Sequence, residues 1–380
     1  MNYNDVIDFV KKIHKGKSVI NLSEPYFFGN EIKYVTDAIN STYVSSVGKY
    51  VNEVESRTAK LLNVKSSVAV VNGTNALQIA LKLAGVKQQD EVITQSVSFV
   101  ATANAITYLN AKPIFIDVDL DTFGLCPDSL HKFLKEECIL KSEGTFNKKT
   151  GKRIRACIPM HTFGFVNNIE KIIKICNDWK IKVVEDAAEA FGSSKKGKYA
   201  GTFGDFGIFS FNGNKIITSG GGGIIVTNNK EDGQKAKYLT TTAKISHKWE
   251  YIHDEIGYNF RMPNINAALL VAQLENFEKI RDLKRKLFNK YLDFFKDKNI
   301  ILKEPPNEVY WNYWLFTIQL SSFKERNNFL EKCHKSGIRS RPVWRLLYKL
   351  PMFKDCQRDD QKNSIFLEST LVNLPSTDSI

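Results

Sequence analysis

The chain has 380 residues, of which 43% are hydrophobic and 25% are charged, and its formal net charge is +13. Its length and composition are typical of a globular protein with two unequal domains, and no apolar run approaches the roughly 20 residues that a membrane helix needs. The N-terminal segment is amphipathic and carries acids, which excludes a secretory signal, so we expect a cytoplasmic protein with no membrane partner.

The positive charge raises nucleic acid as a partner. The lysines are spread over many amphipathic helices, however, without a basic arm or an aromatic-interleaved patch, so we expect no nucleic-acid partner. The six cysteines form no C-x-x-C pair and the six histidines have no metal-ligand spacing. These patterns indicate reduced thiols and argue against both a disulfide framework and a metal site.

The N-terminal 62 residues are predicted to form a helix with a short arm, and then two further helices. The second helix covers residues 31–40, where apolar residues recur at helical spacing, and the third covers residues 54–62. The small, polar stretch over residues 41–49 lies between them. It is either a plain connector or a loop that wraps a ligand, and in the second case Ser45 is a candidate ligand contact.

A first ligand-binding turn is predicted at V-N-G-T-N-A-L, residues 71–77. A buried strand over residues 68–71 leads into it, and a helix follows. The free backbone N–H groups at such a helix start, together with the hydroxyl of Thr74, suit a phosphate group.

The next strand, loop and helix are predicted in E-V-I-T-Q-S-V-S-F-V-A-T-A-N-A-I. Phe99 follows the tip of this strand, where it is either core or an aromatic face for a flat ligand. Another strand follows over residues 113–119, and the lysine-rich segment 128–155 is predicted to be an exposed insertion or hairpin. After it, a strand and loop carry His161, which is a base, a substrate contact or a capped structural histidine.

A helix over residues 168–179 precedes a buried strand, V-V-E-D, that ends in Asp186. Ligands bind at the carboxyl edge of open α/β sheets, which makes Asp186 a candidate site residue. Glu185 is the competing acid, but successive side chains of a strand point to opposite faces. Strands that alternate with helices in this way predict a mostly parallel sheet covered on both faces.

The run F-S-F-N-G-N-K-I-I-T-S-G-G-G-G, residues 209–223, brings Lys215 from an apolar strand into a short polar loop. A lysine held between buried strands is costly as a bare ammonium ion, and one use for it is a Schiff base with a carbonyl cofactor, which needs a neutral amine. The alternative is a surface lysine in a glycine-rich turn.

The C-terminal part begins with a polar, basic stretch over residues 230–252 that contains an uncertain helix. G-Y-N-F-R-M-P-N-I-N-A-A-L-L then opens a long helix that is predicted to continue to Leu287. A strand, a helix and the segment R-S-R-P-V-W follow. We therefore predict a large domain over residues 1–255, including an N-terminal arm, and a smaller C-terminal domain over residues 256–380.

A phosphate cradle, a carboxylate and a lysine 29 residues after that carboxylate are together what pyridoxal phosphate needs. This cofactor has a 5′-phosphate, a ring nitrogen that must stay protonated and an aldehyde that reacts with lysine.

In this order, the stretches resemble the DegT/DnrJ/EryC1/StrS sugar aminotransferases, which are fold type I pyridoxal-phosphate enzymes. The resemblance runs from about Asn21 to the C-terminus. It is closest to the LegC-type branch, on the stretches Y-V-S-S-V-G-K-Y-V, T-S-G-G-G-G and R-P-V-W-R-L-L-Y-K-L-P-M-F. It implies an α/β fold whose large domain has a mostly parallel sheet of the seven-stranded type, with a smaller α/β domain at the C-terminus.

The resemblance also implies residue roles. Asp186 keeps the ring nitrogen protonated, while Lys215 holds the resting cofactor and later moves the proton between the substrate and the cofactor. The other expected cofactor contacts are Gly73, Thr74, Asn75, Phe99, Glu189, Ser210 and, from the neighbouring subunit, Asn259. The expected substrate contacts are Ser45, His161, Trp344, Arg345 and, from the neighbouring subunit, Arg261. Trp344 has the alternative of being core of the small domain.

Two positions depart from many relatives, which have histidine in place of Asn212 and glutamine or histidine in place of Glu189. A carboxylate at position 189 would lie near the phenolic oxygen of the cofactor, where a second anion is unfavourable unless it is protonated or turned away. The dehydratases of this family have histidine in place of the lysine, so the retention of Lys215 favours amino transfer.

The function implied is transfer of the amine of L-glutamate to C4 of a nucleotide-linked 4-keto-6-deoxy-N-acetylhexosamine, with UDP as first choice and GDP or dTDP next. The product would serve legionaminic acid, bacillosamine or a similar surface glycan such as lipopolysaccharide. A homodimer with shared active sites is expected. The alternatives are a 3-keto-sugar aminotransferase and a regulator that binds pyridoxal phosphate without turnover.

Overall fold

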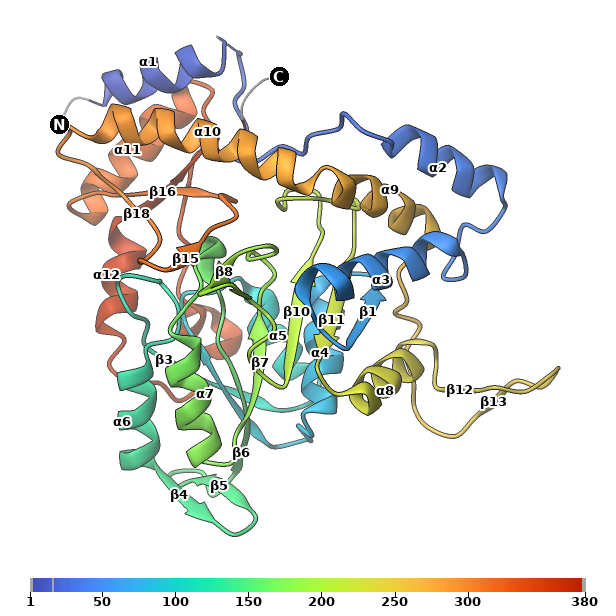
Figure 1. Ribbon diagram of the computed structural model, residues 1–380. Helices are drawn as coiled ribbons and strands as arrows, with labels where there is room; N and C mark the ends of the chain where they lie inside the picture. The colour runs from blue at the N-terminus through green and yellow to red at the C-terminus, as the bar shows by residue number, and fades with distance from the viewer. Residues whose placement is uncertain (1–2, 16, 378–380) are drawn as a thin grey trace.

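A nine-stranded sheet forms the centre of the larger domain in the computed structural model, which describes residues 3–15 and 17–377 (Figure 1). Its main path runs β1-β11-β10-β7-β6-β2-β3, in which β11 is antiparallel to both of its neighbours and the five strands from β10 to β3 are mutually parallel. The hairpin β4–β5 adds two strands beside β6. The prediction of a mostly parallel sheet with a seven-stranded path is confirmed.

The strands of this sheet are β1 (Ser66–Val70), β2 (Glu91–Gln95), β3 (Lys112–Ile116), β4 (Cys138–Lys141), β5 (Gly144–Asn147), β6 (Arg153–Ile158), β7 (Lys182–Asp186), β10 (Phe206–Ser210) and β11 (Gly223–Thr227). All five residues of β2 and of β11 are buried, so neither strand shows the alternation of a half-exposed sheet. The neighbours Ile224 and Ile225 belong to two separate hydrophobic cores, one on each face. Burial of both faces is typical of parallel sheets.

Helices of the large domain cover both faces of this sheet (Figure 1). They are α3 (Lys49–Leu62), α4 (Gly73–Leu83), α5 (Val100–Thr107), α6 (Pro127–Glu137), α7 (Ile169–Asp178) and α8 (Lys230–Thr240). Helix α2 (Glu31–Asn40) lies apart from the sheet and packs against the helix over Asn264–Glu275 (Figure 1). Helices α4 and α5 contribute to the core that contains Ile225, whereas α6 and α7 contribute to the core that contains Ile224. The segment 128–155 includes the predicted hairpin, but it opens with most of helix α6 and ends inside β6, so it is not simply an insertion.

The smaller sheet of the C-terminal part has the order β14-β16-β18-β17 and is antiparallel. Its strands are β14 (Ile301–Leu302), β16 (Phe316–Gln319), β17 (Arg341–Pro342) and β18 (Leu371–Leu374). The helices of this part are α9 (Asn264–Glu275), α10 (Phe277–Phe295), α11 (Phe323–Lys335) and α12 (Lys362–Thr370).

The long helix predicted to continue to Leu287 is instead two helices that meet at Asn276. This residue has φ −106° and ψ 7°, and its side-chain Nδ2 donates to the carbonyl of Ala272 at 3.1 Å. Asparagine competes for backbone hydrogen bonds in this way, which explains the break between α9 and α10.

Two small sheets complete the structure. One joins β8 (Ser194–Lys195), β9 (Lys198–Tyr199) and β15 (Val309–Tyr310), and the other is the hairpin of β12 (Lys244–Ile245) and β13 (Ile252–His253). This hairpin projects away from the body of the molecule at the right of Figure 1. No helix in the described ranges is both long enough and apolar enough to cross a membrane.

Both ends of the chain cross between the two predicted domains. Helix α1 (Asn4–Ile13) packs on the C-terminal part, where Phe9 stacks on Phe294 with ring centroids 4.0 Å apart (Figure 1). In the other direction, Phe115 of the large sheet donates its N–H to Gln357 and accepts one from Asp359, so a C-terminal segment pairs with strand β3. The division at residue 255 remains a prediction, and its outer ends (residues 1–2 and 378–380) lie outside the described residues.

Candidate active site

The carboxyl ends of the parallel strands meet at a cavity of about 410 Å³, which we call the site cavity. Strands β7 and β10 end in it, and the turns after β1 and β2 reach it. It is where ligands bind in open α/β sheets. It brings together eight of the predicted site residues: Gly73, Thr74, Phe99, Asp186, Glu189, Ser210, Lys215 and Trp344.

Asp186 is a buried carboxylate at the end of β7, with 3% of its surface exposed. Its Oδ2 accepts a hydrogen bond from Thr102 Oγ1 at 2.7 Å, and its Oδ1 accepts one from the N–H of Ala188 at 3.2 Å. Burial raises the pKa of this carboxyl, even though both hydrogen bonds act in the other direction. Because the buried carboxylate is poorly solvated, a cation beside it in the cavity would form a strong ion pair with it.

The neighbouring acid, Glu185, faces away from the site cavity. It accepts hydrogen bonds from the backbone N–H groups of Gly201, Phe203 and Gly204, and it lies 2.9 Å from His161 Nε2. His161 accepts the N–H of Asn167 at Nδ1, so Nε2 carries the hydrogen and donates it to Glu185. The contacts of Glu185 with His161 and Gly201 are fully buried, and together these bonds hold the strand ends in place. Of the three alternatives for His161, they match a structural histidine.

Lys215 follows β10 and its amine reaches into the site cavity. The Nζ atom lies 3.5 Å from Glu189 Oε1 and 4.2 Å from the ring centroid of Trp314. The indole of Trp314 is fixed because its Nε1 donates to the carbonyl of Asn214 at 2.7 Å. An aromatic face and a carboxylate thus hold the lysine amine in the cavity when no ligand is bound.

Glu189 is almost fully buried, and its Oε2 accepts the N–H of Phe163 at 2.8 Å. Burial raises the pKa of this carboxyl to about 7. Phe163 has a left-handed backbone, with φ 55°, which is uncommon for a residue other than glycine. The strained turn at Thr162–Gly164 therefore aims a backbone donor at the acid that contacts Lys215.

In the cofactor-free protein, replacing Glu189 by glutamine should raise the free energy of unfolding relative to the wild type, and this gain should increase with pH. Glu189 releases its proton near pH 4.5 in the unfolded chain and near 7 in the folded protein, so the folded state binds that proton more tightly between these values. Stability from this group is therefore present below pH 4.5 and is lost as the pH rises through 7. In Glu189→Gln the amide oxygen still accepts the N–H of Phe163. The amide has no proton to release in this pH range, so the variant does not lose this stability as the pH rises.

The expected gain in unfolding free energy grows by at most about 1.4 kcal/mol per pH unit and levels off at about 3 kcal/mol above pH 7. Denaturant unfolding of both proteins from pH 4.5 to 8.5 measures it. The exposed Glu304→Gln is the matched control. A difference between Glu189→Gln and wild type that does not change with pH would contradict the interpretation.

The start of helix α4 forms one wall of the site cavity. The first N–H groups of a helix have no partner within the helix, and here Asn72 Oδ1 caps that of Asn75 at 2.8 Å. The amides of Gly73 and Thr74 remain for a ligand. A Cβ atom at position 73 would lie 3.0 Å from Ser210 Cβ, so glycine lets the helix start approach the end of β10. The arrangement suits a phosphate group.

Six predicted site residues lie outside the site cavity: Ser45, Asn75, His161, Asn259, Arg261 and Arg345. Arg261 bridges Glu55 at 2.6 Å and donates to the carbonyl of Ala69, which gives it a structural role within its own chain. Ser45 and Asn259 are exposed at the surface. Arg345 lines a neighbouring cavity.

Sequence reasoning missed Thr102 and Trp314, which contact Asp186 and Lys215. Thr102 lies one helical turn after Phe99, and that spacing could have indicated it. No local signal marks Trp314, because it lies 99 residues after Lys215, in the other predicted domain.

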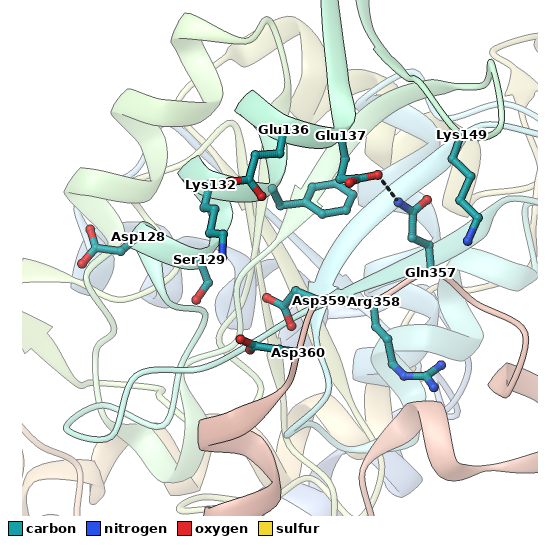
Figure 2. A pocket seen from close by; sticks show the side chains of 11 residues that line it. Asp128, Ser129, Lys132, Glu136, Glu137, Lys149, Gln357, Arg358, Asp359 and Asp360 are labelled. Atoms are coloured by element: carbon teal, nitrogen blue, oxygen red, sulfur yellow. Dashed lines mark hydrogen bonds between the residues drawn. The ribbon is translucent and has the colours of Figure 1, made fainter.

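A second hollow, of about 560 Å³, lies between helix α6 and the C-terminal segment 357–360 (Figure 2). Its acids alternate with lysine and arginine side chains, and Gln357 donates to Glu137 across it at 3.4 Å. Asp359 is already bound to the N–H of Asp117. This hollow shares no residue with the site cavity, and the bonds of Gln357 and Asp359 hold the C-terminal segment in place.

Comparison with known proteins gives matches that span the site cavity. The model of the DegT/DnrJ/EryC1/StrS aminotransferase family matches residues 27–380. GDP-perosamine synthase of Escherichia coli O157:H7 is 34% identical over 95% of this chain and 94% of that protein. UDP-N-acetyl-3-dehydro-alpha-D-glucosamine 3-aminotransferase of Acidithiobacillus ferrooxidans is 30% identical over 77% of this chain and 74% of that protein.

A solved structure with the same fold is PseC of Helicobacter pylori, an aminotransferase involved in the biosynthesis of pseudoaminic acid. It has a TM-score of 0.83 and 23% identity, and the match covers 94% of this chain and 93% of that one. Every residue that lines the site cavity lies within residues 27–380, the part of the chain that the family model covers.

Proposed function

The chain belongs to the DegT/DnrJ/EryC1/StrS aminotransferase family, whose cofactor is pyridoxal phosphate, and from this premise we propose a specific reaction. The enzyme transfers the amine of L-glutamate to C4 of a nucleotide-linked 4-keto-6-deoxy-N-acetylhexosamine, with UDP as the carrier. The product is a 4-amino-4,6-dideoxy sugar nucleotide, made in the cytoplasm for a glycan of the legionaminic acid or bacillosamine type.

One observation carries the assignment of the site. A buried carboxylate, a lysine amine and a helix start with two N–H groups left for a ligand line a single cavity, in which they match the ring nitrogen, the aldehyde and the phosphate of pyridoxal phosphate. Gly73, Thr74 and Ser210 would hold the phosphate. Phe99 would lie against the ring, and Asp186 would pair with its nitrogen.

Bound pyridoxal phosphate supplies an electron-poor ring that stabilises the negative charge left when the substrate loses its Cα proton. Asp186 keeps that ring effective because its carboxylate favours the protonated nitrogen. Lys215 is placed to take the Cα proton and to return it on the cofactor side, since its amine is the basic group that reaches into the cavity from β10. Trp314 and Trp344 form the wall on the side of the small domain.

The active form is proposed to be a homodimer with shared sites. Large apolar side chains are exposed on α2 and on the β12–β13 hairpin, including Ile32 at 84%, Trp249 at 71% and Tyr251 at 80%. Exposed apolar groups of this kind mark interaction surfaces. Asn259, at the base of the hairpin, is exposed and lies outside the cavity of its own chain, as a residue given to a partner's site would.

The choice of C4 and of UDP rests on the LegC-type stretches at residues 43–51, 218–223 and 341–353. The 3-keto alternative has its own support in the relative that is a 3-aminotransferase. The two reactions differ only in which keto isomer is aminated.

We expect mass analysis to find one aminated product when the enzyme is incubated with pyridoxal phosphate, glutamate and a panel of acceptors. The panel holds UDP-, GDP- and dTDP-linked 4-keto-6-deoxy sugars and a UDP-linked 3-keto sugar, with Lys215→Ala as the control. Amination of the 3-keto sugar alone would replace the proposal by its alternative. If glutamate fails to change the cofactor absorbance at all, the chain is a binding protein without turnover.

A further inference from the structure

A single buried asparagine, Asn312, bonds to two residues that contact the amine of Lys215. Its Nδ2 donates to the carbonyl of Glu189 at 2.8 Å, and its Oδ1 accepts the N–H of Trp314 at 3.1 Å. The carboxylate of Glu189 lies 3.5 Å from Lys215 Nζ, and the ring centroid of Trp314 lies 4.2 Å from it. Asn312 does not line the site cavity, so it can act on the reaction only through its neighbours.

The side-chain amide of Asn312 has a partner for each of its polar atoms. A second bond from Nδ2 goes to the carbonyl of Phe191 at 3.1 Å, so both hydrogens of the amide nitrogen have an acceptor. Two carbonyls face the nitrogen and one N–H faces the oxygen, which allows the amide only one orientation. Because the residue is completely buried, no water replaces these bonds if the amide is removed.

The tryptophans of the same segment, W-N-Y-W at residues 311–314, are bound to the large sheet in a similar way. Trp311 Nε1 donates to the carbonyl of Phe163 at 2.9 Å, in the turn after β6. Trp314 Nε1 donates to the carbonyl of Asn214, in the loop after β10. The asparagine between them holds the turn after β7. Since β10, β7 and β6 are adjacent in the sheet, one short segment fastens the carboxyl ends of three strands.

The close fit of this segment depends on the backbone of two residues. A Cβ atom at position 164 would lie 2.3 Å from Asn312 Oδ1 and 2.9 Å from Trp311 Nε1, so glycine lets the turn after β6 approach the segment. Tyr313 has a left-handed backbone with φ 59°. A residue other than glycine keeps such a conformation only where the surrounding structure fixes it, and residues of this kind gather at active sites.

We infer that Asn312 is a positioning residue for the amine of Lys215, an inference that rests on the role proposed for that lysine. It holds Glu189 through its carbonyl and Trp314 through its N–H, so the carboxylate and the ring meet the amine from fixed directions. The amine must reach both the aldehyde of the cofactor and the Cα proton of the substrate, and a displacement of about 1 Å costs up to about 100-fold in rate.

The test is to replace Asn312 by leucine, which has a similar shape and makes none of these bonds. We expect kcat to fall by about 10- to 100-fold, with a smaller change in the KM for glutamate. The circular dichroism band of the bound cofactor should weaken, because this band depends on how the protein holds the cofactor ring. Asn312→Ser should lie between the leucine variant and the wild type, since its hydroxyl can still accept the N–H of Trp314.

Asn147→Leu is the matched control. Asn147 is buried, and its Nδ2 donates to Glu91 and Gln357, at 2.7 Å in both cases. Its Oδ1 accepts the N–H of Lys149 at 2.9 Å, so it has the same pattern of bonds as Asn312. Because Glu91 is the first residue of β2, this asparagine lies at the edge of the sheet opposite the site cavity. Both leucine variants should lower the Tm, but the control should keep the cofactor band and kcat.

The outcomes distinguish a positioning role from a structural one. A lower Tm in Asn312→Leu with an unchanged cofactor band and kcat would overturn the inference. If that variant does not fold, a folded Asn312→Ser with the band and kcat of the wild type would overturn it instead. The function on which the inference rests is tested separately, in the wild type. If the cofactor band of the wild type persists in Lys215→Ala, the role of the lysine is wrong and the inference falls with it.

Discussion

Replacing Lys215 by alanine is expected to abolish amino transfer, with a fall in kcat of about 10⁴-fold or more. In the proposed reaction, the lysine supplies both the amine that holds the cofactor and the base that moves the Cα proton. Among the described residues that line the site cavity, no other amine or imidazole is present to replace it. Lys215→Arg should be almost as inactive, because arginine keeps its proton and cannot serve as a base.

Single-turnover absorbance changes with glutamate measure this effect, and thermal unfolding confirms that the variants fold. Residual activity of more than a few per cent would show that another group moves the proton.

The same variant tests whether the active site is shared between two subunits. A mixture of Lys215→Ala and Asn259→Ala chains can form dimers in which one site has both native residues, so activity should reappear on mixing if Asn259 acts in the partner's site.

Asp186→Asn is expected to lower kcat by about 10²- to 10³-fold while leaving the fold intact. The carboxamide has nearly the same shape and retains an oxygen for the hydroxyl of Thr102, but it has no negative charge to keep a ring nitrogen protonated. Removing the charge removes a desolvation cost, because burial raises the pKa of Asp186, whereas the carboxamide loses the second oxygen that accepts the N–H of Ala188. These effects oppose each other, so the cofactor-free variant should be about as stable as the wild type.

The adjacent Glu185→Gln is the matched control for this variant. Glu185 accepts three backbone N–H groups and contacts His161, all away from the site cavity, so its neutralisation should cost stability and not chemistry. Asp186→Asn should therefore lose kcat and keep its free energy of unfolding, whereas Glu185→Gln should lose free energy of unfolding and keep its kcat. Loss of stability in Asp186→Asn, with activity retained, would mean that its carboxylate serves the fold and not the reaction.

Several of the predicted residues that line the site cavity lie where a local pattern ends in a polar group. Asp186 closes a buried strand, Thr74 starts a helix after a strand, and Lys215 interrupts apolar runs, so each is marked within about ten residues of sequence. The parallel sheet was predictable for the same reason, because its strands are apolar throughout and alternate with helices.

The rest of the site depends on contacts between distant segments. Trp314 reaches Lys215 from the other predicted domain, and the neighbouring cavity that Arg345 lines joins the N-terminal arm to β17, more than 300 residues away. Arg261 was assigned to a partner's substrate from a motif, yet in its own chain it pairs with Glu55, 206 positions earlier. No periodicity or spacing reports such pairings, since they are fixed only when the two segments pack.

Each end of the described chain packs on the other predicted domain, so the order of synthesis affects when the fold can be completed. Strand β3 at the rim of the large sheet keeps an open side until residues 357–359 pair with it, and helix α1 has no packing partner until α10 is synthesised. An unpaired strand rim invites association with other chains. The nascent polypeptide therefore carries an open sheet edge until residues 357–359 have been made, so the large sheet stays incomplete while most of the C-terminal helices and strands are synthesised.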